Sequence, residues 1–452
     1  MPDEARTDNE ELRQRLREAL ARIEQLEQEN RQLREQLEQA QQQVARQAAP
    51  FRREPRQKIA EEQKKRPGRQ AGHPGFHRVI PAAIDETVEL PLEQCPHCGG
   101  PVRDCQRLEQ IIEEIPPVRP HVVRVISYRG QCQRCGAVQT AHPLQSSHGR
   151  GAAKVQLGPR ALALAALLNK VHGLTLRKSC QVLKDLCGLR ITPGGLSQAL
   201  CRVAGRVAGQ YEELIQQLRA SAAVHADETS WWVGGPSWWL WVFTTAQVTV
   251  YRVDQSRGSE VVREILGDDF GGMLTSDCLS SYDPPAYRKH KCISHHLRAI
   301  AEAAALPGQK NPAYLQNWKC FFYAVLALYK LRGVMSDEQF LRTRAVMERW
   351  RDQGLTQPAG QPGDERIRKR LFKQREHLLG CLYEPAAEPT NNRAERALRP
   401  AVIARKLSCG NKTPRGRDCW QTLASLGVSC HQQAKDFIQY LSSLLSLVPA
   451  PG

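Results

Sequence analysis

The stretch AAVHADETSWWV (222–233) decides the fold together with GGMLTSDC (271–278), because in both of them apolar and β-branched residues predict a buried strand. Between them lie two further strand-like segments, WWLWVFTTA (238–246) and VTVYRVDQS (248–256), and one helix-like segment, SEVVREILG (259–267). A helix that connects two strands of one sheet indicates that those strands run parallel. The sequence therefore predicts an α/β domain with a mixed sheet.

Two of these strands carry an aspartate beside apolar residues. Asp227 follows Val224 and Ala226, and Asp277 follows Leu274. A carboxylate in a buried sheet is costly unless a cation compensates its charge, and Mg²⁺ prefers oxygen ligands of this kind. If the two strands are neighbours, both carboxylates project from adjacent strand ends. One more acid would then complete a site for two metal ions, which suits displacement at phosphorus.

We expect the third acid in NNRAERALRP (391–400). Asn392, Glu395, Arg396 and Arg399 recur there at helical spacing, which places one carboxylate among hydrogen-bond donors on one helix face. The alternative is an ordinary surface pair between Glu395 and an arginine. The competing candidates for the third acid are Glu228, Asp283, Glu384 and Glu388.

The charge balance indicates a polyanionic partner. The 452 residues include 64 Lys and Arg against 47 Asp and Glu, a net charge of +17. Residues 1–50 hold 8 basic and 11 acidic side chains, so the remainder carries +20. Nucleic acid is the simplest partner for such an excess, and a generally basic surface is the alternative. No apolar run reaches transmembrane length and the N-terminus does not resemble a secretory signal, so we expect a cytoplasmic, nucleoid-associated protein without a membrane partner.

The N-terminal region predicts a coiled coil over residues 8–48. Apolar residues including Leu12, Leu16, Leu26 and Leu33 follow alternating spacings of four and three, and Asn30 occupies a core position that favours a parallel pair. The alternative is one amphipathic helix packed on its own protein. Residues 49–84 form a basic linker rich in Pro and Gly, in which Arg66 and Arg69 could follow DNA phosphates or could simply be solvated.

Residues 85–145 predict a zinc ribbon. Cys95 and Cys98 form one Cys-x-x-Cys-Gly turn, and Cys132 and Cys135 form another 33 residues later. Four thiolates in two such turns can complete a tetrahedral shell around one structural Zn²⁺, and the stretches between them read as short strands. A redox dithiol would need only one such pair.

Residues 152–220 are expected to be helical. Two helices joined by a short turn at LRITPGG (189–195) fit a helix-turn-helix that binds DNA, and plain helical packing explains the pattern equally well.

Four motifs resemble those of one known family. HADETSWW (225–232), LTSDCLSSYD (274–283), HKCISHHLR (290–298) and TNNRAERALRPAVIARK (390–406) are similar to signatures of the insertion sequence 66 family of DDE transposases. The order of zipper, linker, zinc ribbon, helical segment and acidic core also agrees, and the resemblance covers about residues 10–445.

The resemblance implies a ribonuclease-H-like mixed sheet core at 221–405 with a large helical insertion at about 285–385, followed by a basic helical segment at 406–452. The catalytic triad then falls on Asp227, Asp277 and Glu395. These three residues would hold two Mg²⁺ or Mn²⁺ ions, and the activity would be DNA cleavage and strand transfer.

The implied partners are DNA, as element ends and as target, and a second copy of the chain through the coiled coil; the sequence leaves open whether accessory proteins take part. His295 and Arg298 match a family histidine and arginine, and a phosphate contact and a buried histidine are equally expected there. The expected DNA-binding residues are Arg66, Arg69, His295, Arg298, Asn392, Arg396, Arg399, Arg405 and Lys406. The alternative function is a non-catalytic DNA-binding regulator with a degenerate core, and a purely hydrolytic nuclease would share the triad.

Overall fold

The computed structural model describes residues 25, 28, 29, 32, 79–147, 155–284 and 286–446. The contacts divide the chain into Met1–Arg119 and Pro120–Gly452, and each part is described by itself. The four described residues between 25 and 32 are helical and exposed. The rest of the predicted coiled coil lies outside the described residues, and so do Arg66 and Arg69. No helix among the described residues is long and apolar enough to cross a membrane.

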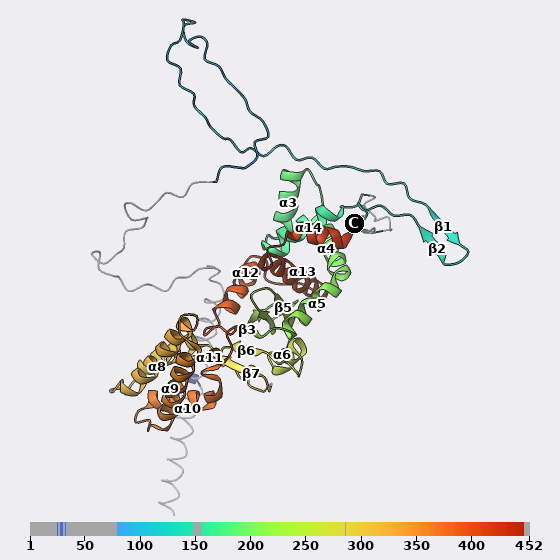
Figure 1. The fold of residues 1–452 in the computed structure, drawn as a ribbon. Coiled ribbons are helices and arrows are strands. Elements are labelled where there is room, and N and C mark those ends of the chain that lie inside the picture. The colour runs from blue at the N-terminus through green and yellow to red at the C-terminus, as the bar shows by residue number, and fades with distance from the viewer. Residues whose placement is uncertain are drawn as a thin grey trace, which may run out of the picture. The chain divides into compact units, whose positions relative to one another are not determined.

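The second part is built on a five-stranded mixed sheet in the order β5-β4-β3-β6-β7 (Figure 1). Strands β3, β4 and β5 are antiparallel neighbours, whereas β3, β6 and β7 run parallel. The parallel pair predicted around the crossover helix is therefore confirmed, as is the α/β class. The strands are β3 (Ala223–Trp231), β4 (Trp238–Thr244), β5 (Thr249–Asp254), β6 (Met273–Ser276) and β7 (Arg288–Lys291).

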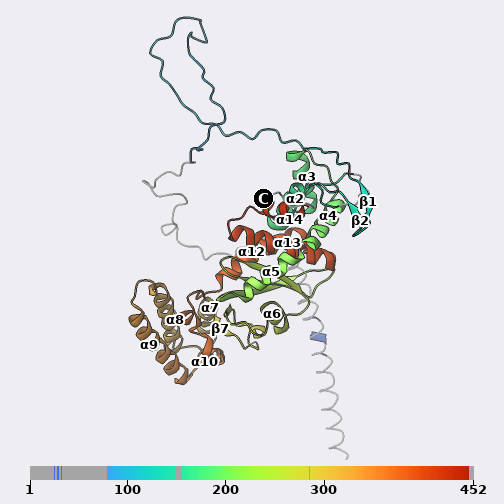
Figure 2. The same cartoon turned by 45° about the vertical axis from the view of Figure 1, so that its right-hand side comes forward.

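Helices cover both faces of this sheet, as Figures 1 and 2 show from two directions. Before the sheet come α2 (Pro159–Ala166), the π-helical turn η2 (Leu167–Val171), α3 (Leu176–Cys187), α4 (Pro193–Arg206) and α5 (Ala208–Arg219). Within it lie α6 (Ser259–Leu266) and the 3₁₀ turn η3 (Ser280–Tyr282). After it come α7 (Ile293–Ala304), α8 (Ala313–Leu331), α9 (Asp337–Thr356), α10 (Pro362–Lys373), η4 (Arg375–His377), α11 (Gly380–Tyr383), α12 (Asn392–Ser408), α13 (Pro414–Gln432) and α14 (Phe437–Leu445).

The alternation of side chains along β3 assigns each helix to its face of the sheet. Val224 and Ala226 belong to the core formed with α5 and α6. Trp231, which lies on the opposite face, packs with Ala394 and Leu398 of α12. Asp227 is on the face of Trp231, because the two residues are separated by an even number of positions.

Helices that precede the sheet in the sequence share a hydrophobic core with helices that follow it. Buried residues of α2, α4, α13 and α14 belong to the same cluster as the α6 face of the sheet, and α13 packs directly on β5. Described residues from each of the ranges 152–220, 221–405 and 406–452, predicted as successive segments, thus contribute to this one cluster.

The predicted helical insertion forms a second core around Trp318, Phe321 and Phe322. Its expected start near residue 285 needs correction, because residues 288–291 form β7 at the edge of the sheet. Charged residues in RKHK hid this strand, since Lys289 and Lys291 do not follow the apolar pattern of a buried strand. The helical block begins only at Ile293.

Candidate catalytic site

Asp227 and Asp277 are brought level by the register of two parallel strands. The pairs between β3 and β6 run from Ala223 with Met273 to His225 with Thr275, a constant difference of 50 positions. Continued by two residues, the same register sets Asp227 opposite Asp277. The ladder itself ends at His225 and Thr275, so both aspartates follow just beyond the paired part of the strands, where the charge of Asp277 still contributes to the raised pKa of Asp227.

Local hydrogen bonds hold both carboxylates in place. Oδ1 of Asp227 accepts a hydrogen bond from the backbone N–H of Glu228 at 3.0 Å. Oδ1 of Asp277 accepts one from the N–H of Leu279 at 2.9 Å, two residues ahead, which is the bond by which aspartate typically begins a turn. Each aspartate therefore keeps its second oxygen for another partner.

Glu395 reaches the same face because Asn391 anchors the start of α12. The buried Asn391 donates from Nδ2 to the carbonyl oxygen of Ala226 at 2.8 Å, and its N–H lies 3.1 Å from Sγ of Cys292. One helical turn later, the N–H of Glu395 donates to the carbonyl of Asn391 at 3.1 Å. The first turn of α12 is thereby fixed beside the residue that precedes Asp227.

Asp227 is affected by both other carboxylates. Burial raises its pKa to about 7, with further increases from the negative charges of Glu228, Asp277 and Glu395. Asp277 and Glu395 are thus both within electrostatic reach of Asp227. Among the described residues, however, no three His, Cys, Asp or Glu side chains converge closely enough to hold a metal ion as they stand. Coordination would require these side chains to rotate towards a common point.

The competing acids differ from these three in having cationic partners. Glu228 pairs with Arg257, Asp283 with Lys291 and Lys373, Glu384 with Arg288, and Glu388 with Arg393. No salt bridge within the described part of the chain involves Asp227, Asp277 or Glu395. Three hard oxygen donors without a protein cation are a donor set that fits Mg²⁺ or Mn²⁺.

The expected DNA-binding residues of α12 divide into two groups. Asn392, Arg396, Arg399 and Lys406 are exposed. Arg405 instead binds β3: its Nη1 donates to Oγ1 of Thr229 at 3.2 Å and also to Ser230. We therefore assign Arg405 to holding α12 on the sheet.

The pair on α7 is also divided. Arg298 is exposed, whereas His295 is partly buried and its Nδ1 has no hydrogen-bond partner among the described residues. The structure leaves both expected roles of His295 in place.

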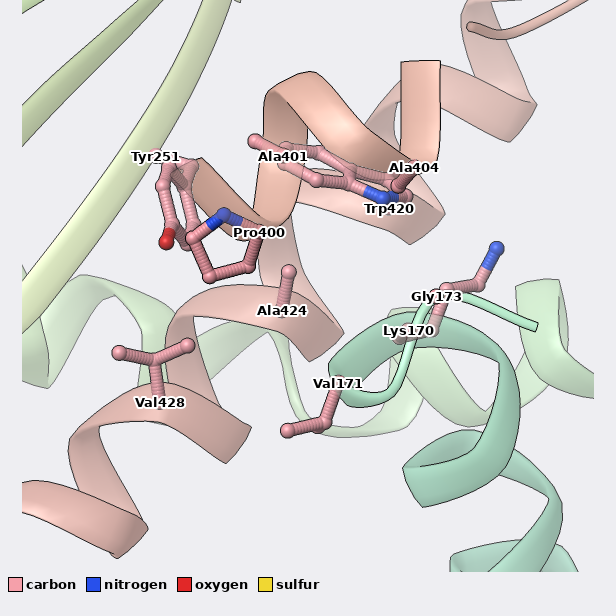
Figure 3. A pocket seen from close by; sticks show the side chains of 10 residues that line it. All are labelled: Lys170, Val171, Gly173, Tyr251, Pro400, Ala401, Ala404, Trp420, Ala424 and Val428. Atoms are coloured by element: carbon pink, nitrogen blue, oxygen red, sulfur yellow. The ribbon is translucent and has the colours of Figure 1, made fainter. Parts of the chain in front are cut away.

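The middle of α12, around Pro400, makes a second contact with the sheet. Pro400 lacks an N–H and interrupts the ladder, and the hydroxyl of Tyr251 donates to the nearby carbonyl of Ala397 at 2.6 Å. Figure 3 shows the small hollow at this place, lined by mostly apolar side chains with Lys170 as the one charged residue. Because it holds no acid, this hollow is not a candidate for the cation site.

Each cysteine turn has backbone amides directed at sulfur. The amides of His97 and Cys98, and then the Cys98 thiol, lower the pKa of Cys95. The amides of Arg134 and Cys135, and then the Cys135 thiol, lower the pKa of Cys132 in the same way. Each turn thus favours the thiolate of its first cysteine, and the thiolate is the form that binds zinc.

The strands expected between the cysteine turns are largely absent. Residues 108–115 form no strand, and of the stretch 121–130 only the last two residues belong to β1 (Arg129–Cys132), which pairs with β2 (Gly136–Gln139). The apolar residues that suggested strands are exposed, Leu108 by 90% and Ile115 by 82%. They therefore lack the burial that stabilises a strand. The hairpin β1–β2 carries the second cysteine turn at its tip.

Sequence reasoning missed two residues that organise the site. Asn391 was passed over for its neighbour Asn392, although only the former is buried. Tyr282, whose hydroxyl donates to Oε2 of Glu228 at 2.7 Å, lies inside the quoted motif LTSDCLSSYD (274–283) but was assigned no role there. A polar residue just before a helix was the available signal for Asn391, since such positions bind backbone groups.

Two comparisons with known proteins bear on this site. Residues 154–418 match the family described as "Transposase IS66 family". The chain is also 23% identical over 399 residues to an uncharacterized protein, y4qI, of Sinorhizobium fredii; the match covers 76% of this chain and 72% of that protein.

Proposed function

Because the chain belongs to the IS66 family of transposases, we propose that it is a DDE-type transposase, which binds the ends of an insertion sequence, cleaves DNA there and joins the ends to target DNA. The observation that carries this proposal is the group of three carboxylates, Asp227, Asp277 and Glu395, which form no ion pair with any residue that the structure describes. The order β5-β4-β3-β6-β7, in which β4 alone runs antiparallel to the other four strands, supports a ribonuclease-H-like core.

The proposed reaction is phosphoryl transfer on DNA. When bound, two Mg²⁺ or Mn²⁺ ions would activate the attacking water or 3′-hydroxyl and stabilise the leaving oxygen. Asp227, Asp277 and Glu395 would hold these ions. With a pKa of about 7, Asp227 must lose its proton before it can serve as a ligand, so cleavage at limiting metal should decline below neutral pH.

The basic residues of α12 are proposed to bind the DNA backbone. Arg396 and Arg399 are exposed in the first two turns of the helix that carries Glu395, so phosphates bound by them would lie next to the carboxylates. Such contacts give affinity without sequence information and weaken with salt.

The remaining parts of the proposal concern assembly. Cys95, Cys98, Cys132 and Cys135 would hold one structural Zn²⁺, and the ribbon and the helices at 155–220 would recognise the element ends. The coiled coil would pair two chains so that two ends are held together. The need for accessory proteins is a separate question for reconstitution with purified components.

The decisive experiment is a nicking assay with Mg²⁺ or Mn²⁺ on supercoiled DNA that carries the element ends. Asp227→Asn, Asp277→Asn and Glu395→Gln should abolish cleavage and retain DNA binding in a gel-shift assay. Glu384→Gln is the matched control, because Glu384 competed for the role of third acid and is paired with Arg288 at 3.5 Å. Cleavage by Glu395→Gln at the wild-type rate would reject the triad, and wild-type DNA binding without any cleavage would favour a non-catalytic regulator.

A further inference from the structure

Glu228 carries a buried carboxylate directly beside Asp227, but on the other face of the sheet. It pairs with Trp241 across β3 and β4, on the side that α6 covers. Its side chain is only 3% exposed. A buried carboxylate of this kind calls for a separate explanation.

Both oxygens of Glu228 are hydrogen-bonded. The hydroxyl of the fully buried Tyr282 donates to Oε2 at 2.7 Å. Nη2 and Nε of Arg257 donate to Oε1 at 2.8 and 3.3 Å, and the guanidinium lies 4.2 Å from the ring centroid of Trp239. The carboxylate therefore links one residue from the loop after β6 to one from the turn after β5.

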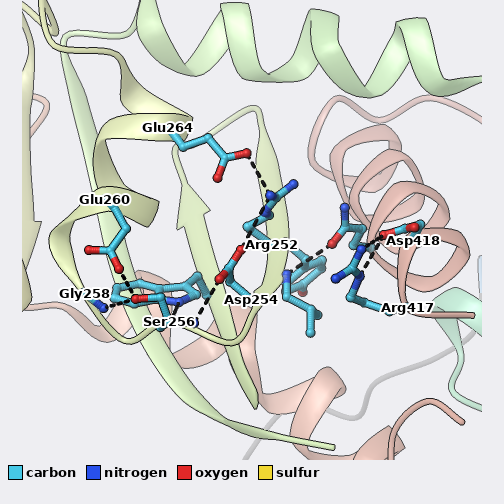
Figure 4. A network of polar contacts seen from close by, with 12 residues as sticks. Arg252, Asp254, Ser256, Gly258, Glu260, Glu264, Arg417 and Asp418 are labelled. Carbon is cyan, nitrogen blue, oxygen red and sulfur yellow. Dashed lines mark hydrogen bonds and ion pairs between the residues drawn. The ribbon is translucent and has the colours of Figure 1, made fainter. Parts of the chain in front are cut away.

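The turn that carries Arg257 is itself tied down, as Figure 4 shows. The N–H of Ser256 donates to Oδ1 of Asp254 at 2.9 Å, and the N–H of Gly258 donates to Oγ of Ser256 at 2.8 Å. Ser281, beside Tyr282, also donates to the carbonyl of Arg257. Arg257 is thus held on both sides and gives Glu228 a fixed partner.

The backbone pairing of β3 and β6 stops before the two aspartates. Its last pair joins His225 with Thr275, two positions before the level of Asp227 and Asp277. Beyond this point no ladder pair fixes the distance between the strands. Side-chain contacts between the two segments must supply that restraint.

Tyr282 is connected to Asp277 through a short turn. The N–H of Leu279 donates to Oδ1 of Asp277 at 2.9 Å, and the N–H of Tyr282 donates to the carbonyl of Leu279 at 3.2 Å. The hydrogen bond from Tyr282 to Glu228 therefore joins the segment of Asp277 to the strand of Asp227, just where the ladder has ended.

We propose that Glu228 and Tyr282 are positioning residues, which set the separation of Asp227 and Asp277 from the opposite face of the sheet and so tune the affinity of these carboxylates for a divalent cation. The inference rests on the proposed function, since that function places the cation at these carboxylates. Partners that orient metal ligands in this way typically change metal affinity about 10–100-fold when they are removed.

The test is Tyr282→Phe, which removes one hydroxyl and keeps the ring. The matched control is Tyr287→Phe, because Tyr287, the residue before β7, is also buried and its hydroxyl donates to the carbonyl of Gly267 and not to any of these acids. Mn²⁺ binding to the full-length protein without DNA is measured by calorimetry, with Asp227→Asn as the reference that lacks the site. Tyr282→Phe should raise the dissociation constant about 10–100-fold, whereas the control should bind as the wild type does.

Two variants of Glu228 separate the effect of its charge from the effect of its hydrogen bond to Tyr282. Glu228→Gln keeps an oxygen that can accept from Tyr282, so Mn²⁺ affinity should stay close to that of the wild type, whereas Glu228→Ala should match Tyr282→Phe. Equal affinities for Tyr282→Phe and the wild type would overturn this inference alone, provided that Asp227→Asn still loses the binding. Unchanged binding by Asp227→Asn would instead overturn the proposed cation site and, with it, the proposed function.

Discussion

Replacement of Asp227 by asparagine should stabilise the protein at neutral pH. Burial and three neighbouring carboxylates raise the pKa of Asp227 from 3.8 to about 7 in the folded state. The folded state therefore binds this proton more tightly than the unfolded state. The stability linked to the group is present below pH 3.8 and is lost as the pH rises through 7. A difference of about 3 pKa units at 1.36 kcal/mol each corresponds to about 4 kcal/mol of unfolding free energy. The wild type loses this stability as Asp227 ionises, whereas the variant, which has no proton to lose there, keeps it.

The assay is urea unfolding in buffers without added divalent cations, followed by tryptophan fluorescence. Trp231 lies on the same strand as Asp227 and Trp241 lies on the neighbouring strand β4, so both report on this part of the core. The difference in unfolding free energy between Asp227→Asn and the wild type should grow from about 1–2 kcal/mol at pH 5 to about 4 kcal/mol at pH 8. Mn²⁺ should stabilise the wild type and not the variant, because only the wild type has the anionic site.

Asp283 provides a control of opposite sign. Burial raises its pKa, but Lys373 and Lys291 outweigh burial and leave the pKa below its usual value. The folded state then favours the charged form, so the stability linked to Asp283 is present above its unfolded pKa and is lost as the pH falls through the lower folded value. Asp283→Asn should therefore destabilise the protein at neutral pH. The reasoning is refuted if Asp227→Asn is the less stable protein at pH 8, or if its advantage does not change with pH.

Three further predictions concern other parts of the chain. Cys95→Ser should reduce zinc from about one ion per chain to none by elemental analysis, whereas Cys105→Ser should retain it; equal zinc content in both variants would reject the ribbon. Asn391→Ala leaves the carbonyl of Ala226 unpaired and should lower the unfolding free energy by about 1–3 kcal/mol and slow cleavage, measured by urea denaturation and the nicking assay. A hydrogen bond from Cys419 lowers the pKa of Cys201 to about 6, so alkylation of Cys201 followed by mass spectrometry should be half-maximal near pH 6 and persist at pH 7; a midpoint above pH 8 would contradict the assignment.

The strands around the acids were predictable because their signal is local. Alternating and β-branched residues in 222–278 indicated β3 to β6, and the helix between β5 and β6 indicated the parallel pair. Asp227 and Asp277 were found because a charge in an apolar strand is unusual at any position. Glu395 needed the family resemblance, since helical spacing alone could not separate it from Glu384 or Glu388.

Other features depend on contacts between residues far apart in the chain. β7 is hidden by its lysines, and Lys291 is buried only because Asp283 and Ser276 bind it. The exposure of Ile115 also contradicts its local pattern, which is that of a strand. Such outcomes follow from tertiary partners, which override local propensity.

The amino-acid order by itself determined the strands β3 to β6 and the aspartates associated with two of them, because backbone propensity and side-chain alternation act over a few residues. Only the tertiary structure decided which of the candidate acids have no basic side chain as a partner among the described residues. The pairing of Glu228, Asp283, Glu384 and Glu388 with basic side chains depends on how helices and loops pack around the sheet. Charge compensation is a property of that packing, since ion pairs form between side chains within about 4 Å of each other in space, whatever their separation in sequence.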